Sequence, residues 1–97
     1  MLFRSRGWDR LGEPLTTVRA TGLSAALTET GRRPEDPGVG ALVYTVVREA
    51  LTNVMRHASG ATRAVVALDH APSFSIVLIS FFMGKFLLFN FKFVYLY

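Results

Sequence analysis

The chain has 97 residues and a net charge of +4, from eleven Lys and Arg against seven Asp and Glu. This length excludes two independent domains, because a chain this short buries only about two-thirds of its unfolded surface even as a single domain. The sequence contains no cysteine and two histidines, which excludes a disulfide framework, a thiolate metal site and most histidine metal sites. The small basic excess does not indicate nucleic acid, and we expect no such partner.

The first 16 residues, MLFRSRGWDRLGEPLT, carry charges throughout and lack the apolar core of a secretory signal. We interpret them as a poorly ordered lead-in and expect a cytoplasmic protein. A short helix is predicted over 14–23, where Pro stands at the start and Gly near the end. The loose alternation of LSAALTET predicts a strand over 23–30, and the following GRRPEDPG predicts a loop.

The strongest structural signal follows this loop. Apolar residues recur every three or four positions, which predicts an amphipathic helix over 38–58. We expect this helix to bury one apolar stripe, formed by Val43, Val46, Val47, Leu51 and Val54. A buried strand is then predicted over 63–69, RAVVALD, because the segment is short, rich in Val and preceded by Gly60.

The polar side of the long helix carries the candidate chemistry. Glu49, Asn53 and His57 are spaced four residues apart and share one stripe, with Arg56 at its border. A carboxylate can act as a base, an amide oxygen is a ligand for Mg²⁺, and Arg with His can donate to phosphate oxygens. The spacing alone also fits an ordinary solvated helix face, so it does not choose between these interpretations.

The surrounding sequence is more specific. The stretch VYTVVREALTNVMRHASGATRAVVALD, residues 43–69, resembles the ATP-binding domain of two-component sensor histidine kinases, and REALTNVMRHA resembles the N-box of that family. The resemblance implies an α+β fold, a partial Bergerat-type (GHKL) two-layer α/β sandwich, over residues 17–73. By this resemblance Asn53 is a ligand of Mg²⁺, Glu49 is the candidate catalytic base, and Arg56 and His57 face the phosphates of ATP.

The resemblance also implies a function for the parent family. Its members bind Mg-ATP and transfer the γ-phosphoryl group to a histidine on a dimerisation helix, with a dimer partner and a response regulator as protein partners. This chain departs from the family after the 63–69 strand. An Asp-x-Gly-x-Gly motif that contacts adenine is expected there, yet no acidic residue follows Asp69. The lid and the phosphoacceptor helix are missing as well, and we interpret His70 as an exposed turn histidine. We therefore expect this chain to be an inactive fragment.

The composition changes abruptly near Pro72. Residues 1–73 contain 30 Gly, Ala, Arg or Pro, whereas 15 of the 24 residues in 74–97 are Phe, Tyr, Met, Ile, Asn or Lys. GC-rich codons encode the first set and AT-rich codons the second, so we interpret 74–97 as a non-homologous hydrophobic tail. An ordinary hydrophobic C-terminal element is the alternative.

More than one structure remains open for this tail. Residues 74–80 are predicted to pair as a strand beside 63–69, followed by an irregular or helical segment that is prone to aggregate. Lys85 and Lys92 oppose a clean membrane span but leave membrane contact possible. The alternative function is accordingly a tail-anchored membrane or interaction protein with an idle N-box.

Overall fold

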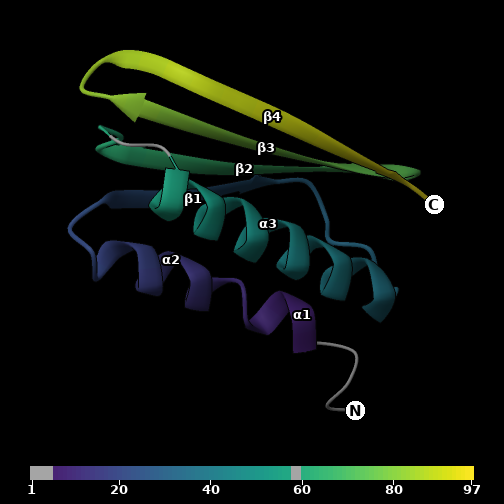
Figure 1. Ribbon diagram of the computed structural model, residues 1–97. Coiled ribbons are helices and arrows are strands. Elements are labelled where there is room, and N and C mark those ends of the chain that lie inside the picture. Colours follow the sequence, from purple (N-terminus) through teal and green to yellow (C-terminus); the bar gives the residue numbers. More distant parts are fainter. Residues whose placement is uncertain (1–5, 58–59) are drawn as a thin grey trace.

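The computed structural model describes residues 6–57 and 60–97. They form an α+β fold of two layers, in which the described helices all cover the same face of a four-stranded sheet (Figure 1). The elements in chain order are α1 (Arg6–Asp9), α2 (Gly12–Arg19), β1 (Ser24–Thr30), α3 (Pro37–His57), β2 (Arg63–Ala71), β3 (Phe74–Met83) and β4 (Phe86–Leu96).

The sheet is mixed, and its strands follow the order of the sequence. The long connection through α3 makes β1 and β2 parallel, whereas β2 with β3 and β3 with β4 are antiparallel hairpins. The predicted pairing of 74–80 with 63–69 is confirmed, and both strands extend further than expected, to Ala71 and to Met83. The β3–β4 turn contains Gly84, whose positive φ of 61° suits a residue without a side chain.

Helix α3 packs along the sheet through one apolar stripe. Val43, Val47, Leu51 and Val54 are at most 3% exposed, as the periodicity predicted, whereas Val46 is only half-buried at the margin of the contact. The helix begins at Pro37, and the Asp36 carboxylate accepts the Gly38 N–H at 2.8 Å, which satisfies one of the unpaired donors at a helix N-terminus. Ala58, where we expected the helix to end, lies outside the described residues.

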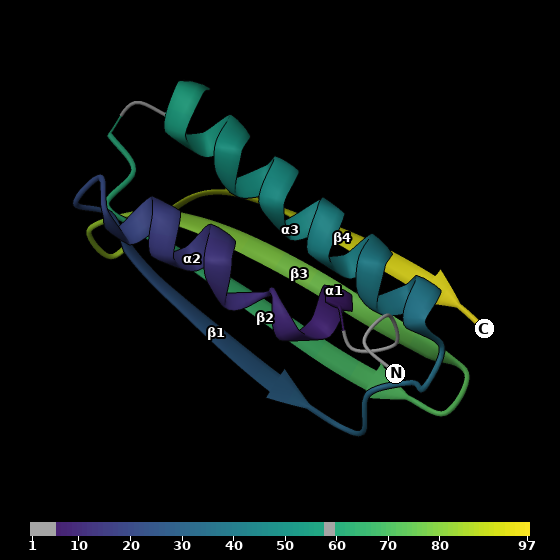
Figure 2. The same cartoon turned by 90° about the horizontal axis from the view of Figure 1, so that it is seen from below.

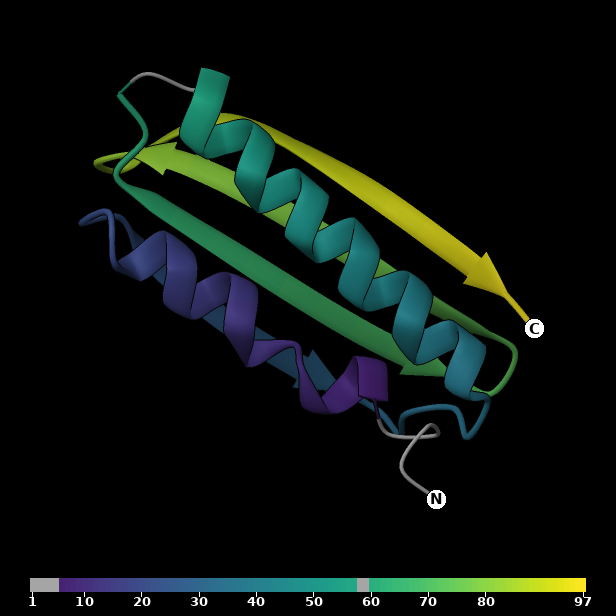
Figure 3. The ribbon, with the colours of Figure 1, turned by 60° about the horizontal axis from the view of Figure 1, so that its bottom comes forward.

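The core lies between the helices and the sheet. Figures 2 and 3 show α1 and α2 on the β1 side of this layer and α3 on the β3 side. The strands contribute alternate residues to the core, with Leu27 partly buried against it and these residues fully buried: Ala64, Val66, Leu68, Val77, Ile79 and Phe81. Three of these six residues come from the hydrophobic tail, so the tail completes the core.

The structure differs from two expectations. Residues 6–16 are not a disordered lead-in, because Trp8, Leu11 and Leu15 are buried and place α1 and α2 in the helix layer. The end of the tail is neither irregular nor helical, because it pairs with β3 as the 11-residue strand β4. Within the described residues, no helix combines the length and apolar character that a bilayer crossing requires.

Helix α1 approaches α3 at two glycines. A Cβ atom built on Gly7 would overlap the backbone of Gly40, and one built on Gly40 would lie 2.7 Å from the Trp8 ring. The two backbones therefore pack without room for a side chain.

We expect Gly7→Ala to lower the free energy of unfolding by about 1 to 3 kcal/mol, because the methyl group overpacks this contact. Gly12→Ala is the matched control, because nothing lies within 4 Å of its Cβ position and the change should stay within about 0.5 kcal/mol. Urea unfolding followed by circular dichroism measures both. Equal stability of the two variants would contradict the close α1–α3 contact.

Candidate functional site

Three of the predicted site residues lie on the exposed side of α3. Glu49, Asn53 and Arg56 are exposed, while Ala50, Leu51 and Val54 on the opposite side of the helix are buried. The packing of the apolar stripe sets this rotation of the helix, and the three polar residues are accessible, as expected for the polar side of the predicted helix. His57 is the last residue of α3, and its side chain lies outside the described part of the structure.

The exposed stripe makes few contacts with the protein. The Arg48 guanidinium donates to the Glu49 carboxylate at a long 3.4 Å, and the side chains of both residues are about half exposed or more. An ion pair this exposed to solvent contributes little to the stability of the fold. The carboxylate therefore remains free to accept a proton or a hydrogen bond from a ligand.

The stripe offers too few ligands for a metal site of its own. Asn53 contributes one amide oxygen, and the described residues contain no group of three or more His, Asp or Glu side chains placed to hold a metal. Mg²⁺ commonly uses one or two protein oxygens, several waters and substrate phosphates. An amide oxygen and a carboxylate, as in Asn53 and Glu49, are oxygen ligands of the type that Mg²⁺ accepts in proteins.

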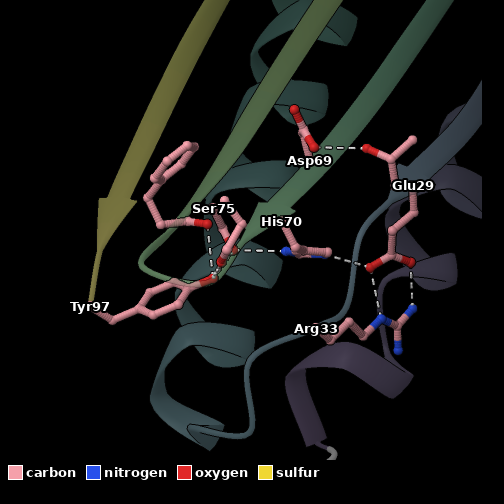
Figure 4. Close-up of polar contacts among 9 residues, drawn as sticks. Glu29, Arg33, Asp69, His70, Ser75 and Tyr97 are labelled. Carbon is pink, nitrogen blue, oxygen red and sulfur yellow. Dashed lines mark hydrogen bonds and ion pairs between the residues drawn. The ribbon is translucent and has the colours of Figure 1, made fainter.

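A second polar cluster lies at the other end of the sheet, where β1 and β2 end and β3 begins, and it is centred on the buried residues His70 and Ser75 (Figure 4). His70 Nε2 lies 2.7 Å from the Glu29 carboxylate, and His70 Nδ1 lies 2.7 Å from Ser75 Oγ. The Tyr97 hydroxyl lies 2.7 Å from the same Ser75 oxygen, and Arg33 binds Glu29 through two hydrogen bonds of 2.8 and 2.9 Å. We call these five residues the His70 cluster.

The interpretation of His70 as an exposed turn histidine is wrong. Its side chain is fully buried, in β2, and the Trp8 ring packs against it in a T-shaped arrangement with ring centroids 5.3 Å apart. The strand alternation of RAVVALDHA carried this signal, because it places His70 on the same face as Ala64, Val66 and Leu68. The partners Glu29 and Ser75 could not be read in the same way, since they belong to other strands.

The order carboxylate, imidazole and hydroxyl is that of hydrolase triads. Ser75 is nevertheless fully buried, and its oxygen is already bonded to His70 and Tyr97. A neighbouring cavity of about 620 Å³ is lined by the 32–36 loop, His70, Ala71, Pro72 and Tyr97, without Ser75. A substrate carbonyl therefore has no path to the hydroxyl, and the cluster is a structural network that satisfies buried polar groups.

The charges in the cluster stabilise the ionised form of Glu29. The hydrogen bond from Arg33, aided by that from His70, holds the pKa of Glu29 below its usual value of 4.5, although partial burial opposes the shift. Because the carboxylate is the favoured form in the folded state, Glu29 stabilises the fold above pH 4.5. This contribution is lost as the pH falls through the folded-state pKa.

No protein-family model matches the chain, and comparison with curated proteins finds no significant relative.

We expect Glu29→Gln to lower stability at pH 7 and to flatten the loss of stability as the pH falls from 7 through the folded-state pKa of Glu29, because the amide cannot form the charged pair with Arg33. Glu35→Gln changes the net charge equally but removes none of these hydrogen bonds. Thermal unfolding measured across this pH range compares the two variants. The same flattening in both would contradict a specific role for Glu29.

Proposed function

We propose that residues 17–73 are the N-box part of an ATP-binding domain of the two-component sensor histidine kinase type. The observation that carries the proposal is the exposed side of α3, where the family-like sequence REALTNVMRHA presents Glu49, Asn53 and Arg56 to solvent. If α3 buried any of these three side chains against the sheet, that side chain could not contact a bound nucleotide. The strand–helix–strand–strand order of β1, α3, β2 and β3 is compatible with part of a Bergerat-type sandwich.

Each exposed residue has a role in this proposal. The Asn53 amide oxygen would bind the Mg²⁺ of Mg-ATP, and Arg56 with His57 would donate to the phosphate oxygens. Glu49 would orient or deprotonate the attacking group as the candidate base. The bound metal would supply charge neutralisation on the phosphates, where the chemistry of phosphoryl transfer concentrates negative charge.

The region where an adenine contact would follow is built differently. Strand β3 ends beside the connection between α3 and β2, since a Cβ atom on Gly60 would lie 3.3 Å from the Met83 sulfur. Figure 3 shows that α3 also ends on this side of the molecule. At this end of the strand the chain turns through Gly84 and Lys85 into β4, so a cation and apolar residues follow β3 where the resemblance implies a carboxylate for the adenine amine. The phosphate contacts alone leave Mg-ATP in water, where charge pairs contribute about 1 kcal/mol or less.

We therefore expect weak nucleotide binding by the chain as it stands. Isothermal titration with a non-hydrolysable ATP analogue and Mg²⁺ should give a Kd no tighter than millimolar, and no self-phosphorylation should be detectable. Asn90→Ala on β4 is the matched control for Asn53→Ala, because both asparagines are exposed. A micromolar Kd that Asn53→Ala abolishes and Asn90→Ala preserves would contradict the predicted inactivity.

A repaired domain tests the assignment itself. Replacing the residues after Asp69 by a family-like strand, an Asp-x-Gly-x-Gly motif and a lid should restore Mg-ATP binding, and Asn53→Ala should abolish that binding. Binding should return because the nucleotide would then be held at both ends, by an adenine pocket and by the phosphate contacts. A repaired domain that folds and still binds no nucleotide would refute the kinase assignment.

A further inference from the structure

Strand β4 exposes large apolar residues on both of its faces. It forms one end of the strand order, and within the described residues it pairs with β3 alone, so its other edge has no partner there. Its large apolar residues remain at the surface, including Phe89 at 44%, Phe93 at 43%, Val94 at 50% and Leu96 at 82% exposure. A long apolar edge of this kind is a template for pairing with another strand.

The hydrogen bonds of β4 identify which backbone groups face outward. The Tyr97 N–H donates to the Ser73 carbonyl at 2.9 Å, so Tyr97 points its backbone toward β3. In an antiparallel ladder the backbone groups alternate in direction, so the odd-numbered residues from Phe89 onward bond β3. The even-numbered residues Asn90, Lys92, Val94 and Leu96 therefore direct their N–H and C=O groups to the free edge.

We propose that this edge pairs with β4 of a second copy of the chain in an antiparallel, two-fold symmetric dimer centred on Phe93. The two four-stranded sheets then join into one of eight strands. This proposal concerns the C-terminal hairpin and does not depend on nucleotide binding.

The register follows from the pattern of the strand. Centring the two-fold axis on Phe93 pairs Asn90 with Leu96 and Lys92 with Val94 of the second copy, so all four outward-facing residues form ladder hydrogen bonds. It also places Phe93 opposite its own symmetry mate and Phe91 opposite Tyr95, which joins aromatic side chains on one face.

The two registers shifted toward the β3–β4 turn are worse for identifiable reasons. Centring on Lys92 sets two ammonium groups directly opposite each other, which is destabilising. Centring on Phe91 brings Leu88 into the ladder, where the β3–β4 register shift between Phe81 and Phe82 leaves an extra residue in β4. The Phe93 register uses only the regular part of the strand.

A lipid surface fits these features less well. Hydrocarbon cannot satisfy the outward-facing N–H and C=O groups, whereas a second strand can. A planar bilayer would also cover only one face of β4, and Phe93 and Val94 are exposed on opposite faces.

The full-length chain tests the proposal by sedimentation equilibrium, with twice the 10.8 kDa chain mass expected. Val94→Pro removes an outward N–H while leaving the β3 ladder intact, so it should yield folded monomer by circular dichroism. Val94→Thr keeps the N–H and a β-branched side chain, and should remain dimeric.

Cysteine cross-linking tests the register, because the natural chain contains no cysteine. Phe93→Cys should form an intermolecular disulfide on mild oxidation, since opposed residues of a non-hydrogen-bonded pair have Cα atoms about 4.5 Å apart. Phe89→Cys is the matched control on the same face, and its symmetry mate would be about 27 Å away at the rise of a strand.

Four results would overturn the proposal. They are a monomeric wild-type chain, large polydisperse assemblies in place of a dimer, cross-linking by Phe89→Cys in preference to Phe93→Cys, and a monomer that sediments with phosphatidylserine vesicles. The last result would identify a membrane surface as the partner of β4.

Discussion

The packing of one apolar stripe of α3 against the sheet organises the rest of the molecule. Val43, Val47 and Leu51 are at most 1% exposed, and full burial of such side chains contributes about 1.5 to 3 kcal/mol each. The same contact sets the rotation of the helix about its axis. Glu49 and Asn53 consequently face solvent, and the long crossover through α3 allows β1 to lie parallel to β2.

The hydrophobic tail divides into two strands with different physical roles. Val77, Ile79 and Phe81 of β3 are completely buried beneath the helix layer, so the fold depends on residues that follow the change in composition. Strand β4 receives little of this cover, and only Phe91 and Tyr95 pack partly against the core. Strands β3 and β4 are both apolar, but β3 is a core strand and β4 an exposed edge strand, because the helix layer covers the sheet only as far as β3.

The His70 cluster shows how the fold tolerates a polar group in its core. Both ring nitrogens of His70 have partners, and none of the described buried side-chain polar atoms is left without a hydrogen bond. A buried polar group without a hydrogen bond would lower the free energy of unfolding by about 1 to 3 kcal/mol. Because both of its ring nitrogens have partners, His70 avoids this cost at a core position. The arrangement also ties the ends of β1 and β2 to the C-terminal Tyr97, which joins segments far apart in the chain.

Local periodicity determined α3, the exposure of Glu49, Asn53 and Arg56, and the β2–β3 hairpin, because helix and strand patterns are written in neighbouring residues. The resemblance of residues 48–58 to an N-box also rests on contiguous residues, and the kinase assignment drawn from it stays a proposal. Tertiary structure alone brought Glu29 to His70, 41 residues away, and Ser75 to Tyr97, 22 residues away. It also decided that the segment after Lys85 is a strand. Phe and Leu are compatible with either helix or strand. The segment becomes a strand because the edge of β3 offers backbone groups with which it can form hydrogen bonds.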